Sequence, residues 1–287
     1  MTDPMKPGPT ILIIGATGKF GMPLIAELAK RAMTVRALVR NVEQETKVYA
    51  AGAQEVAIGN LNDFASIDAA LNGVDGVFYV PPPFFPDEAE VGKRVVAAAE
   101  QNAVKRITFL SAIHPNLSVA DNHAAKLPVE EAIINSSLQY TILQPAMTFQ
   151  NLLNRWRGVL KTGVFTEPWS VDTRFSRIDA RDVAEVAAIS LTEDRLLYGT
   201  FELCGDTTLS RRELAALMSA VLGRDILPER TDPKSLGSKF AAFIPLFEHY
   251  DHHGLIGNAL VARAILGREP RLLKRFLEEL AIGQHFD

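Results

Sequence analysis

Short apolar runs alternate with amphipathic segments through the first 150 residues, and this alternation most constrains what the chain can fold into. Each run has the length of one buried strand, and each amphipathic segment the length of one helix. Strands and helices in strict alternation predict a parallel sheet with right-handed crossovers and helices on both faces. The predicted strands are 11–14, 34–39, 55–58, 76–80, 106–110 and 140–143, and the predicted helices are 21–31, 43–51, 66–71, 87–102 and 122–136.

The alternation stops after residue 150. There we expect a short strand at 200–203 and helices at 180–192, 210–222, 240–247, 258–266 and 270–281. Ser210 and Glu213 have the spacing of a capping box at the start of one of these helices. The whole pattern predicts an α/β protein: a Rossmann-type doubly wound domain over 1–150, and a smaller α+β substrate lobe over 151–287 that is partly interleaved with it.

Charge and composition exclude several classes of protein. The chain has 30 basic and 34 acidic residues that do not segregate, so a nucleic-acid footprint is not expected. We expect no membrane span, because no stretch of 18 apolar residues occurs, and the first ten residues do not resemble a signal peptide. The single cysteine, Cys204, cannot form an internal disulfide, which favours a reducing cytoplasm. A monomer or a homodimer is expected.

A glycine-rich loop follows the first predicted strand and opens the first predicted helix. Its first glycine permits a tight turn, the second lets the backbone approach a pyrophosphate, and the third lets the helix lie close to the sheet. The start of the helix then offers free N–H groups and the positive end of its dipole to phosphates. The predicted cofactor-binding loop is Gly15, Ala16, Thr17, Gly18, Lys19, Phe20 and Gly21.

The end of the second strand predicts which dinucleotide binds. An Asp or Glu at this place holds the ribose 2′-hydroxyl of NAD, whereas an arginine accommodates the 2′-phosphate of NADP. The chain has Arg40 here, with no acidic residue from 35 to 42. Lys19 adds a second cation nearby, so we predict NADP(H) as the cofactor.

Several motifs together resemble the NmrA-like family of atypical short-chain dehydrogenase/reductases, with its triphenylmethane-reductase-like and quinone-reductase-like members. They are the glycine loop, Leu38-Val39-Arg40, Gln144-Pro145-Ala146-Met147, and the segments 126–130, 176–184 and 209–223. The resemblance implies a cofactor cleft at the carboxyl ends of the strands, with the second lobe as a lid over the substrate. It also implies cofactor contacts from Asn60, Leu61, Val80, Pro81, Pro82, Ser111, Lys126, Pro145 and Met147.

The expected catalytic centre departs from the usual pattern of these dehydrogenases, a Tyr-x-x-x-Lys pair. Lys126 matches the lysine, but Asn122 stands at the tyrosine position, and an amide is no general acid. On one continuous helix the two side chains would share a face, so Lys126 keeps the role of holding the nicotinamide ribose. Ser111 matches the family's strand-end hydroxyl, and His114 or His123 is a candidate proton donor near neutral pH.

Aromatic residues are placed in predicted loops beyond the strand ends, where they suit a flat apolar substrate. Packing in the core is the alternative, and we expect it for at least half of them. The predicted substrate-binding residues are Phe84, Phe85, Phe149, Trp156, Phe165 and Trp169. Residues 248–253 hold three of the six histidines in a stretch that reads as a loop, and adjacent histidines point different ways, so we predict no metal site there.

These features favour an NADPH-dependent reductase that transfers hydride to a small aromatic or quinone-like electrophile, because that chemistry tolerates the missing tyrosine. Two alternatives remain open. One is a non-catalytic sensor that binds NADP(H) and reports its state to a partner protein, which Asn122 in place of tyrosine suggests. The other is a nucleotide-sugar epimerase, which is weaker because such enzymes depend on that tyrosine.

Overall fold

The computed structural model describes residues 8–82, 85–119 and 121–283, which form two compact units. Unit 1 comprises residues up to 116 together with 122–144 and 183–201. Unit 2 comprises 117–121, 145–182 and the residues from 202 onward. Unit 1 thus takes in a helix and most of a strand from beyond residue 150.

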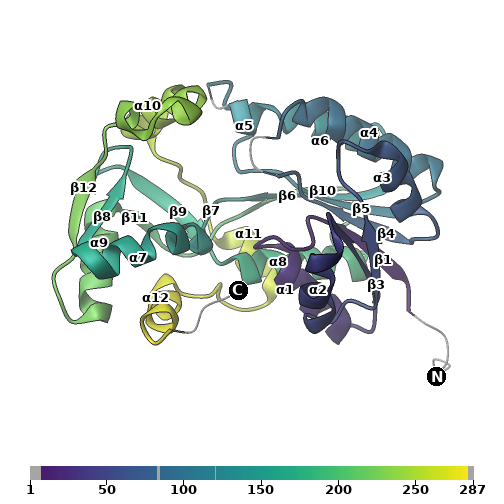
Figure 1. Cartoon of the computed structure of the whole chain (residues 1–287), viewed down its shortest axis with the longest axis horizontal. Helices are drawn as coiled ribbons and strands as arrows, with labels where there is room; N and C mark the ends of the chain where they lie inside the picture. The colour runs from purple at the N-terminus through teal and green to yellow at the C-terminus, as the bar shows by residue number, and fades with distance from the viewer. Residues whose placement is uncertain (1–7, 83–84, 120, 284–287) are drawn as a thin grey trace. The chain divides into compact units, whose positions relative to one another are not determined.

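Unit 1 is built on a seven-stranded sheet in the order β10-β6-β5-β4-β1-β2-β3 (Figure 1). The five neighbouring pairs from β6 to β3 are parallel. The elements wholly or mostly in this unit are β1 (Thr10–Ile14), α1 (Gly21–Lys30), β2 (Thr34–Val39), α2 (Glu45–Ala50), β3 (Glu55–Ile58), α3 (Phe64–Leu71), β4 (Gly76–Tyr79), α4 (Glu88–Gln101), β5 (Arg106–Leu110), α5 (Asp121–Ala124), α6 (Leu127–Ile134), β6 (Gln139–Pro145), α8 (Ala180–Thr192) and β10 (Gly199–Leu203).

Helices cover both faces of this sheet, with α3, α4 and α6 on one face and α1, α2 and α8 on the other (Figure 1). The central strands are continuous apolar runs because both of their faces are buried. On the α3–α4–α6 face, Val95, Val129 and Ile133 pack against strand residues such as Val77 and Ile107. The predicted Rossmann-type class is therefore confirmed.

Unit 2 has two small sheets, of strands β11-β9-β7 and β12-β8, and several helices. Helices α7, α9 and α12 share one apolar core that includes Phe149, Trp156, Phe165 and Phe276. The elements are β7 (Met147–Thr148), α7 (Leu153–Thr162), β8 (Val164–Glu167), β9 (Arg174–Ile178), β11 (Thr208–Ser210), α9 (Arg211–Leu222), β12 (Leu227–Arg230), α10 (Ile244–His253), α11 (Leu260–Leu266) and α12 (Leu273–Ala281). In the part of the chain that the structure describes, no helix is long and apolar enough to cross a membrane.

Three local predictions are wrong. The expected helix 122–136 is interrupted at 125–126, and α6 begins anew with Pro128 in its first turn, a position that proline favours. Residues 248–253 are the end of α10 and not a loop, because Leu246, Phe247 and Tyr250 bury one helical face. Helix α12 begins at Leu273, three residues after Pro270. By contrast, the capping box of Ser210 and Glu213 is confirmed.

Candidate functional site

The glycine loop joins β1 to α1 as a tight turn. Gly15 has φ +96°, and a Cβ there would lie 2.4 Å from Cγ1 of Val80. A Cβ on Gly21 would lie 2.3 Å from the carbonyl oxygen of Gly15 and 2.5 Å from that of Ala16. Gly18 has more room, since its Cβ would lie 3.3 Å from the same Gly15 oxygen. The fold thus requires glycine at 15 and 21. At Gly18 the missing side chain instead leaves the backbone uncovered on its outer side.

Donors are available at this turn. The N–H groups of Thr17 and Phe20 have no acceptor among the residues that the structure describes, and the first turn of α1 carries no acidic residue. Lys19 lies with its Nζ 5.2 Å from the centre of the Phe20 ring. It stays exposed, although the surrounding loop desolvates the ammonium enough to lower its pKa to about 8. This cradle of N–H groups at a helix start fits a pyrophosphate.

Arg40 follows β2, beside the loop's strand in the sheet. Its side chain is exposed, and no carboxylate within 8–82, 85–119 or 121–283 pairs with it. Its backbone N–H donates to Oε1 of Gln44 at 2.9 Å, which fixes the turn after the strand. The guanidinium is therefore available to a phosphate.

Further predicted cofactor residues lie at strand ends, those around β3 and β4 in unit 1 and those at positions 145 and 147 in unit 2. Asn60 follows β3 and accepts a hydrogen bond from the Asn62 N–H at 2.9 Å, while Leu61 is buried. Val80 and Pro81 follow β4, and the Val80 N–H donates to Ile14 at 3.2 Å. Pro145 ends β6, and Met147, which begins β7, belongs to unit 2.

Lys126 lies just before α6 and is 8% exposed. Its Nζ pairs with Oε1 of Glu88, the first residue of α4, which is also buried. Burial raises the pKa of Glu88, against the opposing effect of the Lys126 charge. The ammonium therefore has one fixed partner and two further N–H groups to donate.

Tyr79, the last residue of β4, lies near this pair. Its ring stacks on Phe109 at 5.5 Å, and its buried hydroxyl has no hydrogen-bond partner in the described chain. Burial, with the Glu88 carboxylate as a second cause, raises the pKa of Tyr79. The group is neutral at physiological pH and keeps its proton. Sequence reasoning did not identify Tyr79 or Glu88, because nothing local in the sequence links them to Lys126.

A second buried polar cluster lies at the ends of β5 and β6. The Ser111 hydroxyl donates to Oε1 of Glu130 at 2.5 Å, and Gln144 Nε2 donates to the two Glu130 oxygens at 2.9 and 3.1 Å. The Ser111 proton is thus engaged, and its oxygen remains an acceptor. Glu130 lies one helical turn from Lys126, in a segment already noted for its family resemblance.

The two candidate histidines differ in environment. His123 is buried, and its Nδ1 lies 2.6 Å from the Ile113 carbonyl oxygen. Burial lowers its pKa, in spite of hydrogen bonds to the backbone of Ile113 and His114, which favours a neutral ring. His114 is half-buried with a left-handed φ of 51°. Since the helix is interrupted at 125–126, Asn122 and Lys126 do not share one face of a continuous helix.

The predicted substrate-binding aromatics divide among several places. Phe84 lies outside the described residues, and Phe85 packs partly buried on the core of unit 1. Phe149, Trp156 and Phe165 are not in loops: they lie in the 3₁₀ helix η2 (Phe149–Leu152), in α7 and in β8. They belong to the core of unit 2, each at most 2% exposed. Trp169 is in a loop, where it contacts Phe175, Phe247 and Tyr250.

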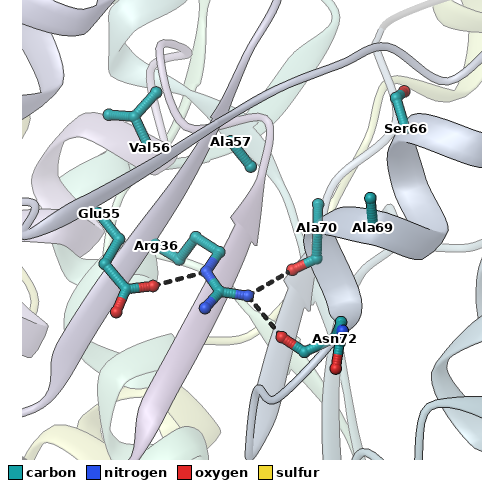
Figure 2. A pocket seen from close by; sticks show the side chains of 8 residues that line it. All are labelled: Arg36, Glu55, Val56, Ala57, Ser66, Ala69, Ala70 and Asn72. Atoms are coloured by element: carbon teal, nitrogen blue, oxygen red, sulfur yellow. Dashed lines mark hydrogen bonds and ion pairs between the residues drawn. The ribbon is translucent and has the colours of Figure 1, made fainter.

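A separate hollow lies between β2, β3 and α3 (Figure 2). Arg36 crosses it and donates to Glu55 at 2.6 Å and to the carbonyl oxygens of Ala70 and Asn72 at 3.0 and 2.7 Å. The guanidinium thus caps the carboxyl end of α3, where a cation is favourable. No residue of the glycine loop lines this hollow, so we assign it no part in the site. Across the described residues, no three His, Cys, Asp or Glu side chains are grouped to hold a metal ion.

Comparisons with known proteins agree with this geometry. The profile of the NmrA-like family matches residues 7–254. An NAD(P)H azoreductase of Xenophilus azovorans is 31% identical over 225 residues, 75% of each chain. A (4-alkanoyl-5-oxo-2,5-dihydrofuran-3-yl)methyl phosphate reductase of Streptomyces griseus is 33% identical over 219 residues, again 75% of each. The predicted family resemblance and the oxidoreductase class are both confirmed.

Solved structures show the same fold. The Escherichia coli NADPH-dependent quinone oxidoreductase complexed with NADPH matches with a TM-score of 0.83 and 24% identity, over 94% of this chain and 99% of that one. The Citrobacter sp. triphenylmethane reductase complexed with NADP(H) matches over the same shares, with a TM-score of 0.84 and 23% identity.

Proposed function

Because the chain belongs to the NmrA-like family, we propose that it is an NADPH-dependent reductase of a small aromatic or quinone-like electrophile. The observation that carries the proposal is the glycine cradle of unit 1 with the unpaired Arg40 beside it. Its relatives support the reaction class, since one is named an azoreductase and another a quinone oxidoreductase. The single cysteine supports a reducing cytoplasm as its location.

The residues of the cradle would hold the cofactor by its phosphates. Thr17 and Phe20 offer backbone donors to the pyrophosphate, and Arg40 pairs with the 2′-phosphate. When bound, the nicotinamide supplies the hydride. Lys126 keeps two N–H groups for the nicotinamide ribose or for negative charge that develops on the substrate, and Glu88 fixes the direction of its side chain.

The second candidate function is a redox sensor that binds NADP(H) without turnover, and Asn122 in place of tyrosine favours it. Steady-state oxidation of NADPH with a panel of quinones and azo dyes distinguishes the two. Turnover above the rate of NADPH oxidation by the same acceptor without protein supports the reductase. Tight NADPH binding without turnover on any acceptor supports the sensor.

Cofactor choice is tested at Arg40. Arg40→Asp should weaken NADPH binding by about 2 kcal/mol, because a charge-assisted pair is lost and a repulsion is gained. The affinity for NADH should change much less. Arg94→Asp, at an exposed arginine on α4, is the control for the change in net charge. Equal dissociation constants of the unmodified protein for NADPH and NADH would contradict the assignment.

A further inference from the structure

Two buried arginines share one carboxylate in unit 2. Arg177 of β9 is 3% exposed and Arg211, the first residue of α9, is 2% exposed. Both approach the same oxygen, Oε2 of Glu167, at 3.6 Å. Arg230 adds a further positive charge nearby and is itself paired with Asp251. The buried group therefore carries two cations against one anion, an arrangement that is costly unless the cations have further partners.

The two arginines are not equally satisfied. Arg211 donates from Nη1 to the Glu229 carbonyl oxygen and from Nη2 to the Trp169 carbonyl oxygen, both at 2.8 Å. Arg177 donates from Nη1 only to the thioether sulfur of Met147, at 2.8 Å. The buried Nε of Arg177 has no hydrogen-bond partner among the described atoms, and neither has that of Arg211, so the two arginines differ at their Nη atoms. Since a thioether is a weak acceptor, Arg177 retains most of its capacity to bind an oxyanion.

The surroundings of Arg177 indicate what kind of molecule carries that anion. Met147 pairs with Arg177 across the β7–β9 ladder and is only half-buried, whereas Arg177 itself is 3% exposed. A ligand therefore reaches the guanidinium only when the Met147 side chain moves. Next to it, the Arg211 guanidinium lies 5.9 Å from the Trp169 ring, which contacts Phe175 and Tyr250 at 5.2 and 5.4 Å. A cation beside packed aromatic rings suits a flat molecule with one anionic group.

We propose that Arg177 binds an anionic oxygen group, a carboxylate, sulfonate or phosphate, carried by an aromatic substrate. The anion replaces the Met147 sulfur as the acceptor of Nη1 and gives Nε a partner, and the Met147 side chain moves aside. The proposal extends the proposed reductase function, and it depends on that function only in calling the bound molecule a substrate. The binding subsite itself is testable without turnover.

The test compares two redox-inert probes of similar shape, naphthalene-2-sulfonate and 2-naphthol, by isothermal titration calorimetry. Arg177→Met should weaken binding of the sulfonate roughly 10- to 100-fold, the loss of a forked charge-assisted contact, and change binding of the naphthol less than 2-fold. Arg212→Met is the matched control, because Arg212 is exposed, follows Arg211 in α9 and pairs with Asp172. It should leave both affinities unchanged.

Other outcomes are equally decisive. If Arg177→Met weakens binding of both probes alike, Arg177 has only a structural role and the proposal is wrong. The proposal is also wrong if the unmodified protein does not bind the sulfonate. If Arg177→Met does not fold, two measurements take its place. One is sulfonate binding by Arg177→Lys, and the other is displacement of the sulfonate from the unmodified protein by inorganic sulfate at constant ionic strength. If the anion belongs to the cofactor, Arg177→Met weakens NADPH and not the sulfonate. Sulfonate binding that depends on Arg177 in a protein without turnover would reject the reductase and keep the subsite.

Discussion

Unit 1 and unit 2 bury their charged side chains for different purposes. In unit 1 the buried Glu88 and Lys126 form a pair beside α6, and the buried Glu130 of α6 bonds to Ser111 and Gln144. The sheet beneath them is already stabilised by its parallel ladder and by an apolar core that runs through α3, α4 and α6. These polar groups are therefore additions to a fold that is complete without them.

Unit 2 has short strands and irregular connections, and its buried carboxylates tie distant segments together. Asp182 is fully buried and accepts hydrogen bonds from Nη2 of Arg268 at 2.8 Å and from the N–H of Arg271 at 2.6 Å. Asp179, also fully buried, accepts from Gln150 at 2.9 Å and pairs with Arg181 at 2.5 Å. From this comparison we expect a buried charge in unit 1 to act in the chemistry, whereas a buried charge in unit 2 first has to be weighed against a structural role.

Among the variants that test this difference between the units, we expect the largest effect, a loss of turnover, from a change at Lys126. Changing Glu88 to Gln and Lys126 to Met together removes the pair without leaving an unpaired buried charge. Turnover should fall roughly 10- to 1000-fold, the scale of one positioned electrostatic group, while the urea midpoint by circular dichroism changes little. Tyr140→Phe, at a half-buried tyrosine of β6, should leave turnover nearly unchanged. A double variant as fast as the parent would remove Lys126 from the reaction.

Asp182 tests the opposite side of the comparison. Asp182→Asn should lower the free energy of unfolding by about 2 kcal/mol, because hydrogen bonds to a charged group are lost while the arginines can still reach water. Tryptophan fluorescence during urea unfolding is the measurement, since Trp156 and Trp169 both lie in unit 2. Asp172→Asn, at an exposed carboxylate paired with Arg212, should cost less than about 0.5 kcal/mol. Equal losses in both variants would mean that burial does not matter here.

The third effect concerns backbone space in unit 1. Gly21→Ala forces a methyl group onto two carbonyl oxygens of the loop, so it should weaken NADPH binding by about 1–3 kcal/mol. Gly18→Ala meets only one oxygen, at 3.3 Å, and should destabilise the fold less than Gly21→Ala, although it blocks close approach of a phosphate. Affinity by fluorescence titration and stability by circular dichroism distinguish the two. A stable Gly21→Ala protein with normal NADPH affinity would contradict the geometry.

The sequence predicted unit 1 better than unit 2, for a physical reason. Local pattern sets a parallel α/β sheet, so the strand Thr34–Val39 of unit 1 was predicted with its correct ends. The capping box at Ser210 in unit 2 was also predicted, because it too is a local pattern. The break before Pro128 was not predicted, although proline favours a first helical turn and so marked the place where α6 begins.

Contacts between distant residues left no such signal. Lys126 and Glu88 are 38 residues apart, and Arg271 and Asp182 are 89 apart. The sequence pattern around an aromatic residue such as Trp156 is the same whether the residue lines a pocket or packs in a core. In this fold Trp156 packs in the core. Local pattern therefore predicted the glycine loop and Arg40, whereas the partners of Lys126 and Ser111 needed the fold.

The smallest effect is a dependence of stability on pH that comes from His123. Burial lowers its pKa in the folded protein, so the unfolded chain takes up the proton first as the pH falls below about 6.5. Stability from this group is thus present above that pH and is lost on acidification toward the folded pKa. The raised pKa of Glu88 acts in the opposite direction, so only a difference between variants isolates the effect of His123.

The variant His123→Asn keeps a donor for the Ile113 carbonyl but cannot titrate. Between pH 7.5 and 5.5 its free energy of unfolding should therefore fall by about 1 kcal/mol less than that of the parent. Urea unfolding followed by circular dichroism measures this, with His253→Asn at the exposed end of α10 as the control. If His123→Asn and the parent lose equal stability, the ring is not held neutral by burial, and His123 returns as a candidate proton donor at neutral pH.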